Sequence, residues 1–245
     1  MVIPADYQAP ADLLKDRVIL VTGAGDGLGR ASALACARHG ASVILLGRTV
    51  AKLEKVYDEI KAAGGAEPAI VPLNLATATW KDYQGLAQTL EAEFSRLDGL
   101  LLNAAHFKRF TPLAELDPAD WLETIQVNLT ASFALMQLLL PLLAQRPDAS
   151  VVLVSDAAGR RGKAFSGAYG VSKFGVEGLM QTWAAELERT NVRVNSFDPG
   201  PLRTGFRSRG YIAEAAQAVP AAESAVPALL WLLGPESRDV RGRAL

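Results

Sequence analysis

The chain has 245 residues, half of them hydrophobic, which is enough to bury a sizeable core in one domain. Its 25 Lys and Arg residues almost balance 26 Asp and Glu residues, and this balance excludes the basic surface that nucleic-acid binding requires. The single cysteine, Cys36, excludes an intrachain disulfide framework. Residues 1–16 lack the apolar core of a signal peptide, and the longest apolar run, 135–143, is too short to span a membrane. These features predict a soluble cytoplasmic protein with no nucleic-acid or membrane partner.

Short, almost continuously apolar segments are typical of strands that are buried on both faces of a sheet. Six segments have this pattern: residues 17–22, 42–46, 69–73, 99–103, 150–155 and 192–197. Helical patterns lie between them, at 27–39, 51–63, 79–96, 119–143 and 168–188. The alternation predicts an α/β protein with a doubly wound Rossmann fold, a parallel sheet with helices on both faces. We expect one domain, 1–245, with residues 1–16 as an N-terminal extension.

A glycine-rich turn joins the first predicted strand to the first predicted helix. It reads Thr22-Gly23-Ala24-Gly25-Asp26-Gly27-Leu28-Gly29. Glycines in such a turn allow tight folding, close approach of the backbone to a pyrophosphate, and close helix–strand packing. The helix N-terminus then offers free N–H groups to the phosphates. Glycines also mark ordinary turns, but the position between strand and helix favours a dinucleotide site.

The second predicted strand ends at Leu46-Gly47-Arg48, where an acidic residue would bind the ribose 2′-hydroxyl of NAD. Gly47 cannot do this, whereas the planar guanidinium of Arg48 suits a 2′-phosphate. NADP(H) is therefore the preferred cofactor and NAD(H) a possible one. An exposed arginine without a ligand is the alternative, and the acidic Asp26 in the glycine turn argues against a 2′-phosphate.

Tyr169 and Lys173 are four residues apart near the start of a predicted helix, so their side chains share one face. A tyrosine has an ordinary pKa of about 10, and a nearby ammonium group favours its phenolate form. Such a pair can pass a proton to or from an oxygen while a hydride moves. The spacing is common in proteins, and it gains meaning here from the upstream glycine turn.

The glycine turn and the Tyr169–Lys173 pair together resemble the short-chain dehydrogenase/reductase family, from about Arg17 to Leu245. The resemblance implies that Tyr169 is the proton donor or acceptor, and that Lys173 lowers its pKa and binds the nicotinamide ribose. It also implies that Asn128 helps to hold a proton-relay water near the lysine. The cofactor-binding residues that it implies are Thr22, Gly23, Asp26, Gly27, Leu28, Gly29, Arg48, Asn74, Leu75, Asn103, Tyr169, Lys173, Pro199, Gly200 and Thr204.

The chain departs from the family pattern where a serine donates a hydrogen bond to the substrate oxygen. Counting back from Tyr169 places Asp156 at that position, and Ser155 is one residue early. A shift of one residue along a strand turns a side chain to the opposite face, so Ser155 can substitute only if the strand end is bent. Asp156 could be neutral and do the work of the serine, or be charged and select a cationic or hydroxyl-rich substrate. It could also cap its own turn and leave the site impaired.

Smaller departures concern the cofactor site and the C-terminal segment. Asn74 replaces an aspartate that faces the adenine, and Leu102 and Ala105 replace the first Asn and the Gly of the family's NNAG motif. Residues 240–245 resemble the start of the family's last strand. The family's dimers pair the helices that hold Asn128 and Tyr169, so a homodimer is expected and a tetramer is in doubt.

Residues 203–223 are expected to form a short loop over the substrate. Arg203, Arg207 and Arg209 lie in it, beside Phe206 and Tyr211. The three arginines could hold an anionic substrate or the cofactor phosphate, but a solvated arginine face is the favoured interpretation. His39 and His106 lack further ligands at metal-binding spacing, so no metal site is predicted. His106 follows the fourth predicted strand; a loop surface is favoured for it, and the edge of the cofactor site is the alternative.

Two functions therefore compete. The first is an NADP(H)-dependent oxidoreductase of a small carbonyl or alcohol substrate. The second is a cofactor-binding protein, a sensor or partner, that has little or no turnover because Asp156 replaces the serine. A hydrolase is discounted because Ser166-Gly167 lacks the G-x-S-x-G frame.

Overall fold

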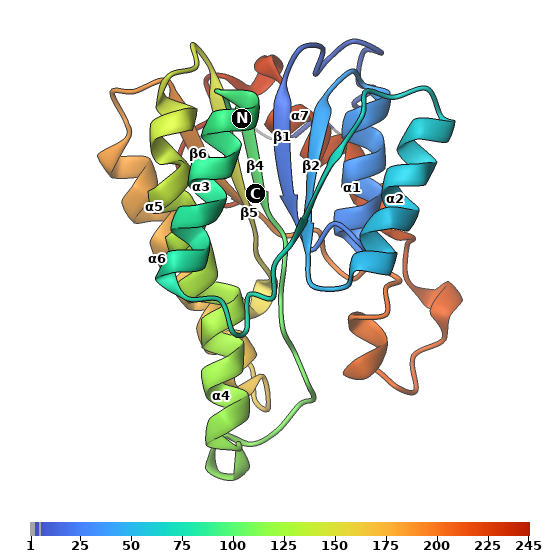
Figure 1. The fold of residues 1–245 in the computed structure, drawn as a ribbon. Coiled ribbons are helices and arrows are strands. Elements are labelled where there is room, and N and C mark those ends of the chain that lie inside the picture. Colours follow the sequence, from blue (N-terminus) through green and yellow to red (C-terminus); the bar gives the residue numbers. More distant parts are fainter. Residues whose placement is uncertain (1–2, 5) are drawn as a thin grey trace.

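The computed structural model describes residues 3–4 and 6–245, and its centre is one six-stranded parallel sheet with the order β3-β2-β1-β4-β5-β6 (Figure 1). The predicted Rossmann topology is therefore confirmed. Each predicted strand is present, with ends that differ by at most one residue. The strands are β1 Val18–Thr22, β2 Ser42–Gly47, β3 Ala69–Pro72, β4 Gly99–Leu102, β5 Ala149–Val154 and β6 Val192–Phe197.

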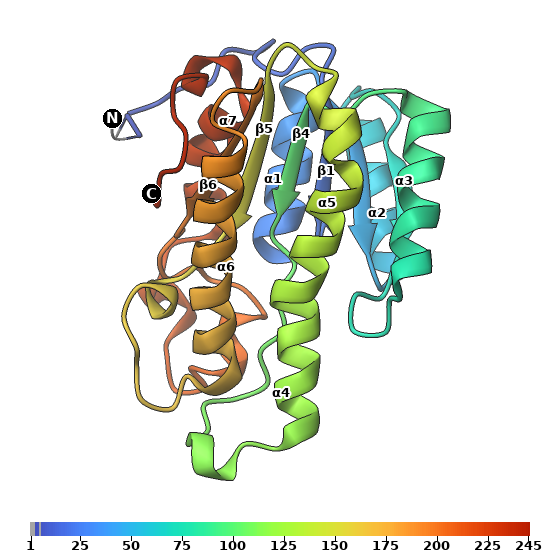
Figure 2. The ribbon, with the colours of Figure 1, turned by 90° about the vertical axis from the view of Figure 1, so that its left-hand side faces the viewer.

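Helices cover both faces of this sheet (Figures 1 and 2). Helices α1 (Gly27–Arg38), α2 (Val50–Ala62) and α7 (Val226–Leu233) contribute to the core on one face. Helices α3 (Trp80–Phe94), α5 (Ala131–Ala144) and α6 (Gly167–Glu186) contribute to the core on the other. The sequence did not lead us to expect α7, which has only eight residues and directly follows a 3-10 turn at Ala222–Ala225.

Alternate residues of β1 serve the two cores. Ile19 and Val21 pack in the cluster with α1 and α7, whereas Val18 and Leu20 pack in the cluster with α3 and α5. This is why the strand sequences are apolar throughout and do not alternate with polar residues. The N-terminal segment joins the first cluster, since Leu13 and Leu14 are buried there.

A long helix crosses the outer surface on the side shown in Figure 2. It begins as α4 (Pro118–Ile125), continues through a π-helical turn at Gln126–Thr130, and ends as α5. The whole helix, Pro118–Ala144, is long and apolar enough to cross a membrane by length and composition alone. The sequence analysis considered only the shorter run at 135–143. Half of its apolar window is buried inside the protein, and core helices of soluble proteins pass the same test.

The C-terminal segment lies beside β6. The backbone N–H of Leu245 donates to the Ser196 carbonyl at 3.0 Å, and that of Ser196 donates to the Arg243 carbonyl at 2.9 Å. The expected start of a last strand is thus reduced to one isolated parallel bridge, between Ser196 and Ala244.

Candidate active site

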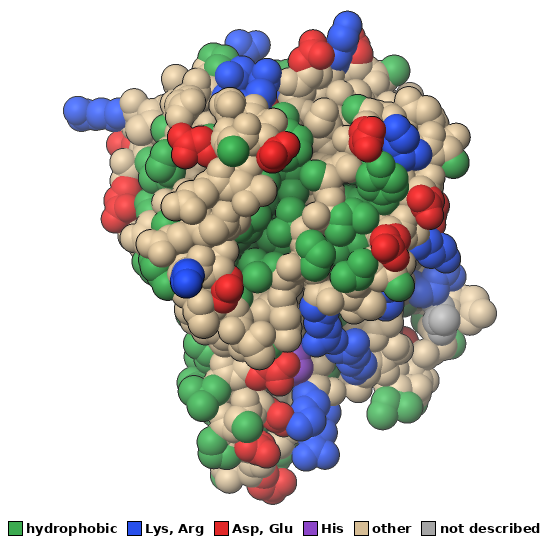
Figure 3. Space-filling view, viewed as in Figure 1, with side chains coloured by type: hydrophobic (Ala, Val, Ile, Leu, Met, Phe, Trp, Pro, Cys, Tyr) green, Lys and Arg blue, Asp and Glu red, His purple; other side chains and the backbone are tan. Residues whose placement is uncertain are grey.

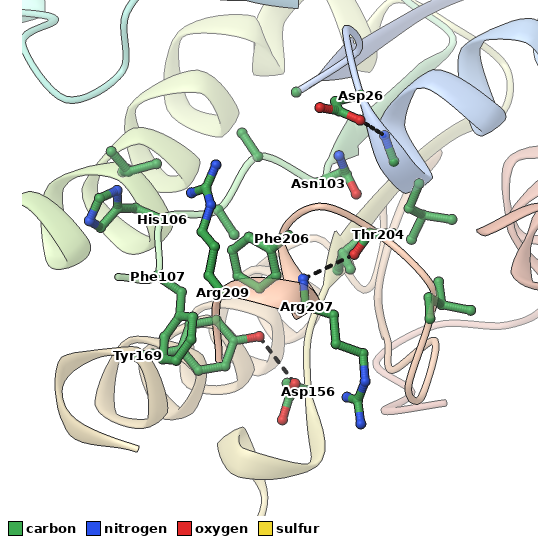
Figure 4. Close-up of a pocket in the computed structure, with 18 of the residues that line it drawn as sticks. Asp26, Asn103, His106, Phe107, Asp156, Tyr169, Thr204, Phe206, Arg207 and Arg209 are labelled. Carbon is green, nitrogen blue, oxygen red and sulfur yellow. Dashed lines mark hydrogen bonds between the residues drawn. The ribbon is translucent and has the colours of Figure 1, made fainter. Parts of the chain in front are cut away.

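A cavity of about 800 Å³ opens at the carboxyl ends of the strands, where ligands of doubly wound sheets bind (Figure 4). Its walls come from the turn after β1, the segments after β2 to β6, and the first turns of α6. Basic side chains gather near the lower centre of the face in Figure 3, below the sheet. The parallel order of the sheet therefore brings residues from six distant parts of the chain to one site.

The glycine turn has the close packing that a dinucleotide site needs. A Cβ atom at Gly29 would lie 2.2 Å from the Gly23 carbonyl oxygen, so only glycine fits between helix and turn. Gly23 itself has a φ of +68°. Thr22 holds the next strand end in place, because its hydroxyl accepts hydrogen bonds from the N–H groups of Asn103 and Ala104, both at 2.9 Å.

The charges at this end of the cavity suit NADP(H). Arg48 lines the cavity, is exposed, and makes no salt bridge with any described residue. Asp26 caps α1 by accepting from Gly27 N–H at 2.8 Å, and Lys52 lies 2.5 Å from its other carboxylate oxygen. The Lys52 ammonium lowers the pKa of Asp26 and offsets its charge. The objection that Asp26 would repel a 2′-phosphate is therefore weakened, and Lys52 adds a cation that the sequence analysis missed.

Tyr169 and Lys173 lie at the inner end of the cavity, one helical turn apart on α6. The Tyr169 hydroxyl donates to the Asp156 carboxylate at 3.1 Å (Figure 4). The Lys173 ammonium is fully enclosed and donates to the Val154 carbonyl at 2.6 Å. It lies 5.6 Å from the centre of the Tyr169 ring. The expected face of α6 is thus confirmed, and Asp156 completes a group of three ionisable side chains.

The pKa of Tyr169 is raised well above its usual value, first by burial and then by the Asp156 carboxylate. The net shift is opposite to the lowering that the resemblance implied for Lys173, because burial and the Asp156 carboxylate both oppose the phenolate charge. Burial also lowers the pKa of Lys173 to about 8, although Asp156 and Asp198 favour its charged form. Tyr169 is therefore held as the neutral phenol, a proton donor.

Asp156, not Ser155, occupies the position facing Tyr169. Ser155 continues the regular pairing of β5, since its N–H donates to the Phe197 carbonyl at 2.7 Å, so the strand end is not bent. Its hydroxyl is buried on the cavity wall without a hydrogen-bond partner among the described residues. Asp156 also caps the short turn that follows it, because its second oxygen accepts from Ala158 N–H at 2.7 Å. The turn then packs on α6 at Gly159, where a Cβ atom would lie 2.7 Å from the Lys173 backbone.

Asn128 lies behind the cavity wall, in the π-helical turn. Its amide oxygen accepts from His106 N–H at 2.6 Å, and its amide nitrogen donates to the His106 carbonyl at 3.1 Å and to Ser172 Oγ at 2.9 Å. It therefore ties the segment after β4 to α6. His106 does not lie on the loop surface, as the sequence suggested: it lines the cavity, and burial lowers its pKa. Its Nε2 atom is buried without a partner in the described chain.

The loop after β6 folds onto the cavity. Thr204 approaches the glycine turn so closely that a Cβ at Gly27 would be 3.1 Å from its methyl group. Arg207 stacks on the Tyr211 ring, 3.9 Å from its centre, and pairs with Glu214 at 2.6 Å. Arg207 and Arg209 line the cavity whereas Arg203 does not. Arg203 and Arg209 are exposed, in keeping with the expected solvated face, whereas Arg207 is partly buried against Tyr211 and Glu214.

Most of the predicted site residues come together around this cavity. Thr22, Gly29 and Asn128 do not line it, and they support residues that do. The sequence analysis missed a second set of lining residues: Phe107, Phe110, Lys163 and Asp198. Phe107 and Phe110 lie four and seven residues after the expected strand end at 103, and this position could have signalled them.

The fold and the cavity define a Rossmann-type α/β protein with the site layout of an oxidoreductase that uses a dinucleotide. A family model for short chain dehydrogenases matches residues 17–213. The chain therefore belongs to the short-chain dehydrogenase family, and the resemblance inferred from its motifs is confirmed.

Three relatives illustrate how close the similarity is. The oxidoreductase YciK of Escherichia coli K12, described as uncharacterized, is 43% identical over 96% of this chain and 93% of its own length. A solved short chain dehydrogenase from Pseudomonas syringae is 52% identical, with 98% of each chain covered and a TM-score of 0.96. A solved short chain dehydrogenase from Escherichia coli CFT073, complexed with NADPH, is 43% identical, with 96% of this chain and 98% of that chain covered and a TM-score of 0.94.

Proposed function

We propose that this chain is an NADP(H)-dependent oxidoreductase that interconverts a carbonyl compound and an alcohol. The observation that carries the proposal is the placement of Tyr169 and Lys173 in the same cavity as the glycine turn. The NADPH complex of the Escherichia coli CFT073 relative supports the cofactor, as does the unpaired Arg48 at the position for a 2′-phosphate.

The cofactor, when bound, supplies or accepts the hydride. Tyr169 donates the proton from its hydroxyl to the carbonyl oxygen in reduction, and takes it back in oxidation. The enclosed Lys173 ammonium stabilises the phenolate that is left, and it can bind the nicotinamide ribose once it turns from the Val154 carbonyl. Asn128 holds the segment after β4 against α6, and so keeps these two parts of the cavity wall in place relative to each other. The substrate oxygen must lie within hydrogen-bond reach of the Tyr169 hydroxyl.

Asp156 gives the alternative function its support. The one proton of the Tyr169 hydroxyl is directed at the Asp156 carboxylate, so an ionised Asp156 competes with the substrate for it. A protonated Asp156 would instead be a second donor to the substrate oxygen. The second candidate, a cofactor-binding protein with little or no turnover, follows if Asp156 stays ionised when the substrate arrives.

The test is NADPH oxidation over a broad panel of aldehydes and ketones, with the natural protein beside Asp156→Ser and Asp156→Asn. We expect turnover by the natural protein that Asp156→Ser does not improve. The asparagine variant keeps a hydrogen-bond donor without the charge, so it separates a donor role from a role of the carboxylate. If the natural protein binds NADPH and only Asp156→Ser turns over, the oxidoreductase proposal is wrong and the binding function stands.

We also propose a homodimer built on the outer faces of α5 and α6, which lie side by side in Figure 2. Phe133 on α5 and Val171 and Phe174 on α6 are among the few large apolar side chains that stay exposed. Large apolar side chains that stay exposed on one side of a protein are typical of an association site. A cytoplasmic location stays a prediction, in keeping with the free buried thiol of Cys36.

A further inference from the structure

The inner wall of the cavity beyond Tyr169 is aromatic. The ring of Tyr169 lies 5.4 Å from Phe107 and 5.8 Å from Phe206, measured between ring centres. Phe107 lies 5.0 Å from Phe110, which lies 5.1 Å from Tyr211. These rings come from the segment after β4, from α6 and from the loop after β6, and all of them line the cavity. We call these five residues the aromatic wall.

Lys163 stands at the far end of the aromatic wall from Tyr169. Its ammonium lies 5.8 Å from the ring centres of both Phe110 and Tyr211, and 3.5 Å from the Tyr211 hydroxyl. Within the described chain, Lys163 and the neighbouring Arg161 have no acidic partner, although both line the cavity. Arg207 differs, because Glu214 already neutralises it.

Two acidic side chains that line the cavity, Asp156 and Asp198, do not pair with Lys163 or Arg161 in the described chain. Asp156 contacts the Tyr169 hydroxyl, and Asp198 accepts from Gly200 N–H at 2.9 Å after β6. A ligand whose reacting oxygen meets Tyr169 thus passes along apolar rings before it reaches unpaired cations. An anionic group of the ligand is complementary to these cations. A carboxylate or phosphate there would gain a charge-assisted hydrogen bond, and no existing salt bridge would have to be broken.

We propose that the substrate is a ring-bearing carbonyl compound or alcohol with an anionic group at the end remote from the reacting oxygen. Its ring packs on the aromatic wall, and its anion is bound by Lys163, with Arg161 as a second cation at the mouth. This inference rests on the proposed oxidoreductase function, and it narrows the substrate from any small carbonyl to one chemical class.

The first experiment compares para-acetylbenzoate with its methyl ester, which has the same ketone and ring but no charge. With NADPH and the natural protein, we expect kcat/KM for the carboxylate to be about tenfold higher, since a charge-assisted hydrogen bond at a half-open site supports about this factor. Levulinate, an anionic ketone without a ring, is expected to be a poorer substrate than para-acetylbenzoate. Equal values for levulinate and para-acetylbenzoate would overturn the role of the aromatic wall.

Two variants identify the cation. Lys163→Met keeps the length of the side chain and removes the charge, so the preference for the carboxylate over the ester should fall toward one, while kcat/KM for the ester changes little. Lys108→Met is the matched control, because Lys108 lies two residues before Phe110 but pairs with Asp120 at 2.7 Å and does not line the cavity. A natural protein that prefers the ester would overturn the assignment of Lys163 as the anion-binding cation. A preference for the carboxylate that is unchanged in Lys163→Met and in the double variant Lys163→Met with Arg161→Met would overturn it as well.

Calorimetric binding of the same two ligands to the protein with NADP⁺ separates this inference from the proposed function. Binding of para-acetylbenzoate that weakens in Lys163→Met, without turnover of it or of any aldehyde or ketone in the panel, would leave the inferred ligand class standing and the oxidoreductase proposal refuted. Turnover of the ester and of neutral ketones without any advantage for the carboxylate would leave the oxidoreductase proposal standing and refute the inference. Absence of binding and turnover with both ligands would overturn the inference.

Discussion

At the scale of single residues, Asp156 shows how one substitution changes a site without disturbing its frame. Each carboxylate oxygen has its own task, because one caps the turn at Ala158 N–H and the other accepts from Tyr169. The family's serine could offer only one hydroxyl at this place. The hydrogen bond to the turn holds the carboxyl group in position beside Tyr169, where it is a partner for the Tyr169 hydroxyl.

The buried ammonium of Lys173 should make the stability of the cofactor-free protein depend on pH. Its pKa falls from 10.5 to about 8 on folding, so between these values the unfolded chain holds a proton that the folded chain has released. Stability therefore rises with pH in this window. We expect the free energy of unfolding to rise by about 1.5 kcal/mol more in the natural protein than in Lys173→Met from about pH 8 to about pH 9.5. Urea unfolding measures this, and identical pH slopes would contradict it.

Gly29 tests the close packing of the phosphate-binding turn. A methyl group there would meet the Gly23 carbonyl oxygen at 2.2 Å and the Asn103 amide at 2.6 Å, so backbone has to move. We expect Gly29→Ala to lose about 1–3 kcal/mol of stability and to weaken NADPH binding more than tenfold. Gly85→Ala is the control, because Gly85 is exposed on α3 with nothing near its Cβ position, and alanine there should add stability. Unchanged NADPH affinity in Gly29→Ala would contradict the expected fit.

At the scale of elements, the loop after β6 closes the substrate end by packing backbone on rings. A Cβ at Gly210 would lie 2.7 Å from Phe107 and 3.0 Å from Phe110. Gly210→Ala should therefore displace the aromatic wall and raise KM for ketone substrates several-fold, while the affinity for NADPH, measured by fluorescence, stays the same. The reverse result, weaker NADPH binding at an unchanged KM, would place the loop over the cofactor instead.

Elements that repeat a pattern were predictable, and contacts between distant elements were not. The strands were predictable because burial on both faces, as in β1, makes their sequences apolar throughout. The glycine turn was predictable because Gly23 has a positive φ and Gly29 has no room for a Cβ atom. By contrast, the aromatic wall joins segments that are 37 or more residues apart, so no local pattern reveals it. The direction of the pKa of Tyr169 depends on burial and on Asp156, which also need the folded chain.

At the scale of the whole molecule, the apolar faces of α5 and α6 determine whether chains associate. Phe174 is 45% exposed on α6, so Phe174→Asp places a charge in the proposed interface. We expect the natural protein to be dimeric and this variant to be monomeric, as measured by light scattering. Val50→Asp is the control, because Val50 is similarly exposed, at 44%, but lies on α2 over the other face of the sheet. A natural protein that is monomeric would refute the dimer. The single domain, 1–245, stays a prediction.

The π-helical turn at Gln126–Thr130 has a consequence for how this protein can change. A π turn holds one more residue than a regular turn, so it rotates everything after it by about 100° about the helix axis. Asn128 faces inward and Phe133 faces outward under the same rotation. Loss of one residue there would restore an ordinary helix and misdirect both side chains at once. Insertions and deletions before Asn128 in this helix therefore change the active site and the outer apolar face together, whereas point substitutions can change them separately.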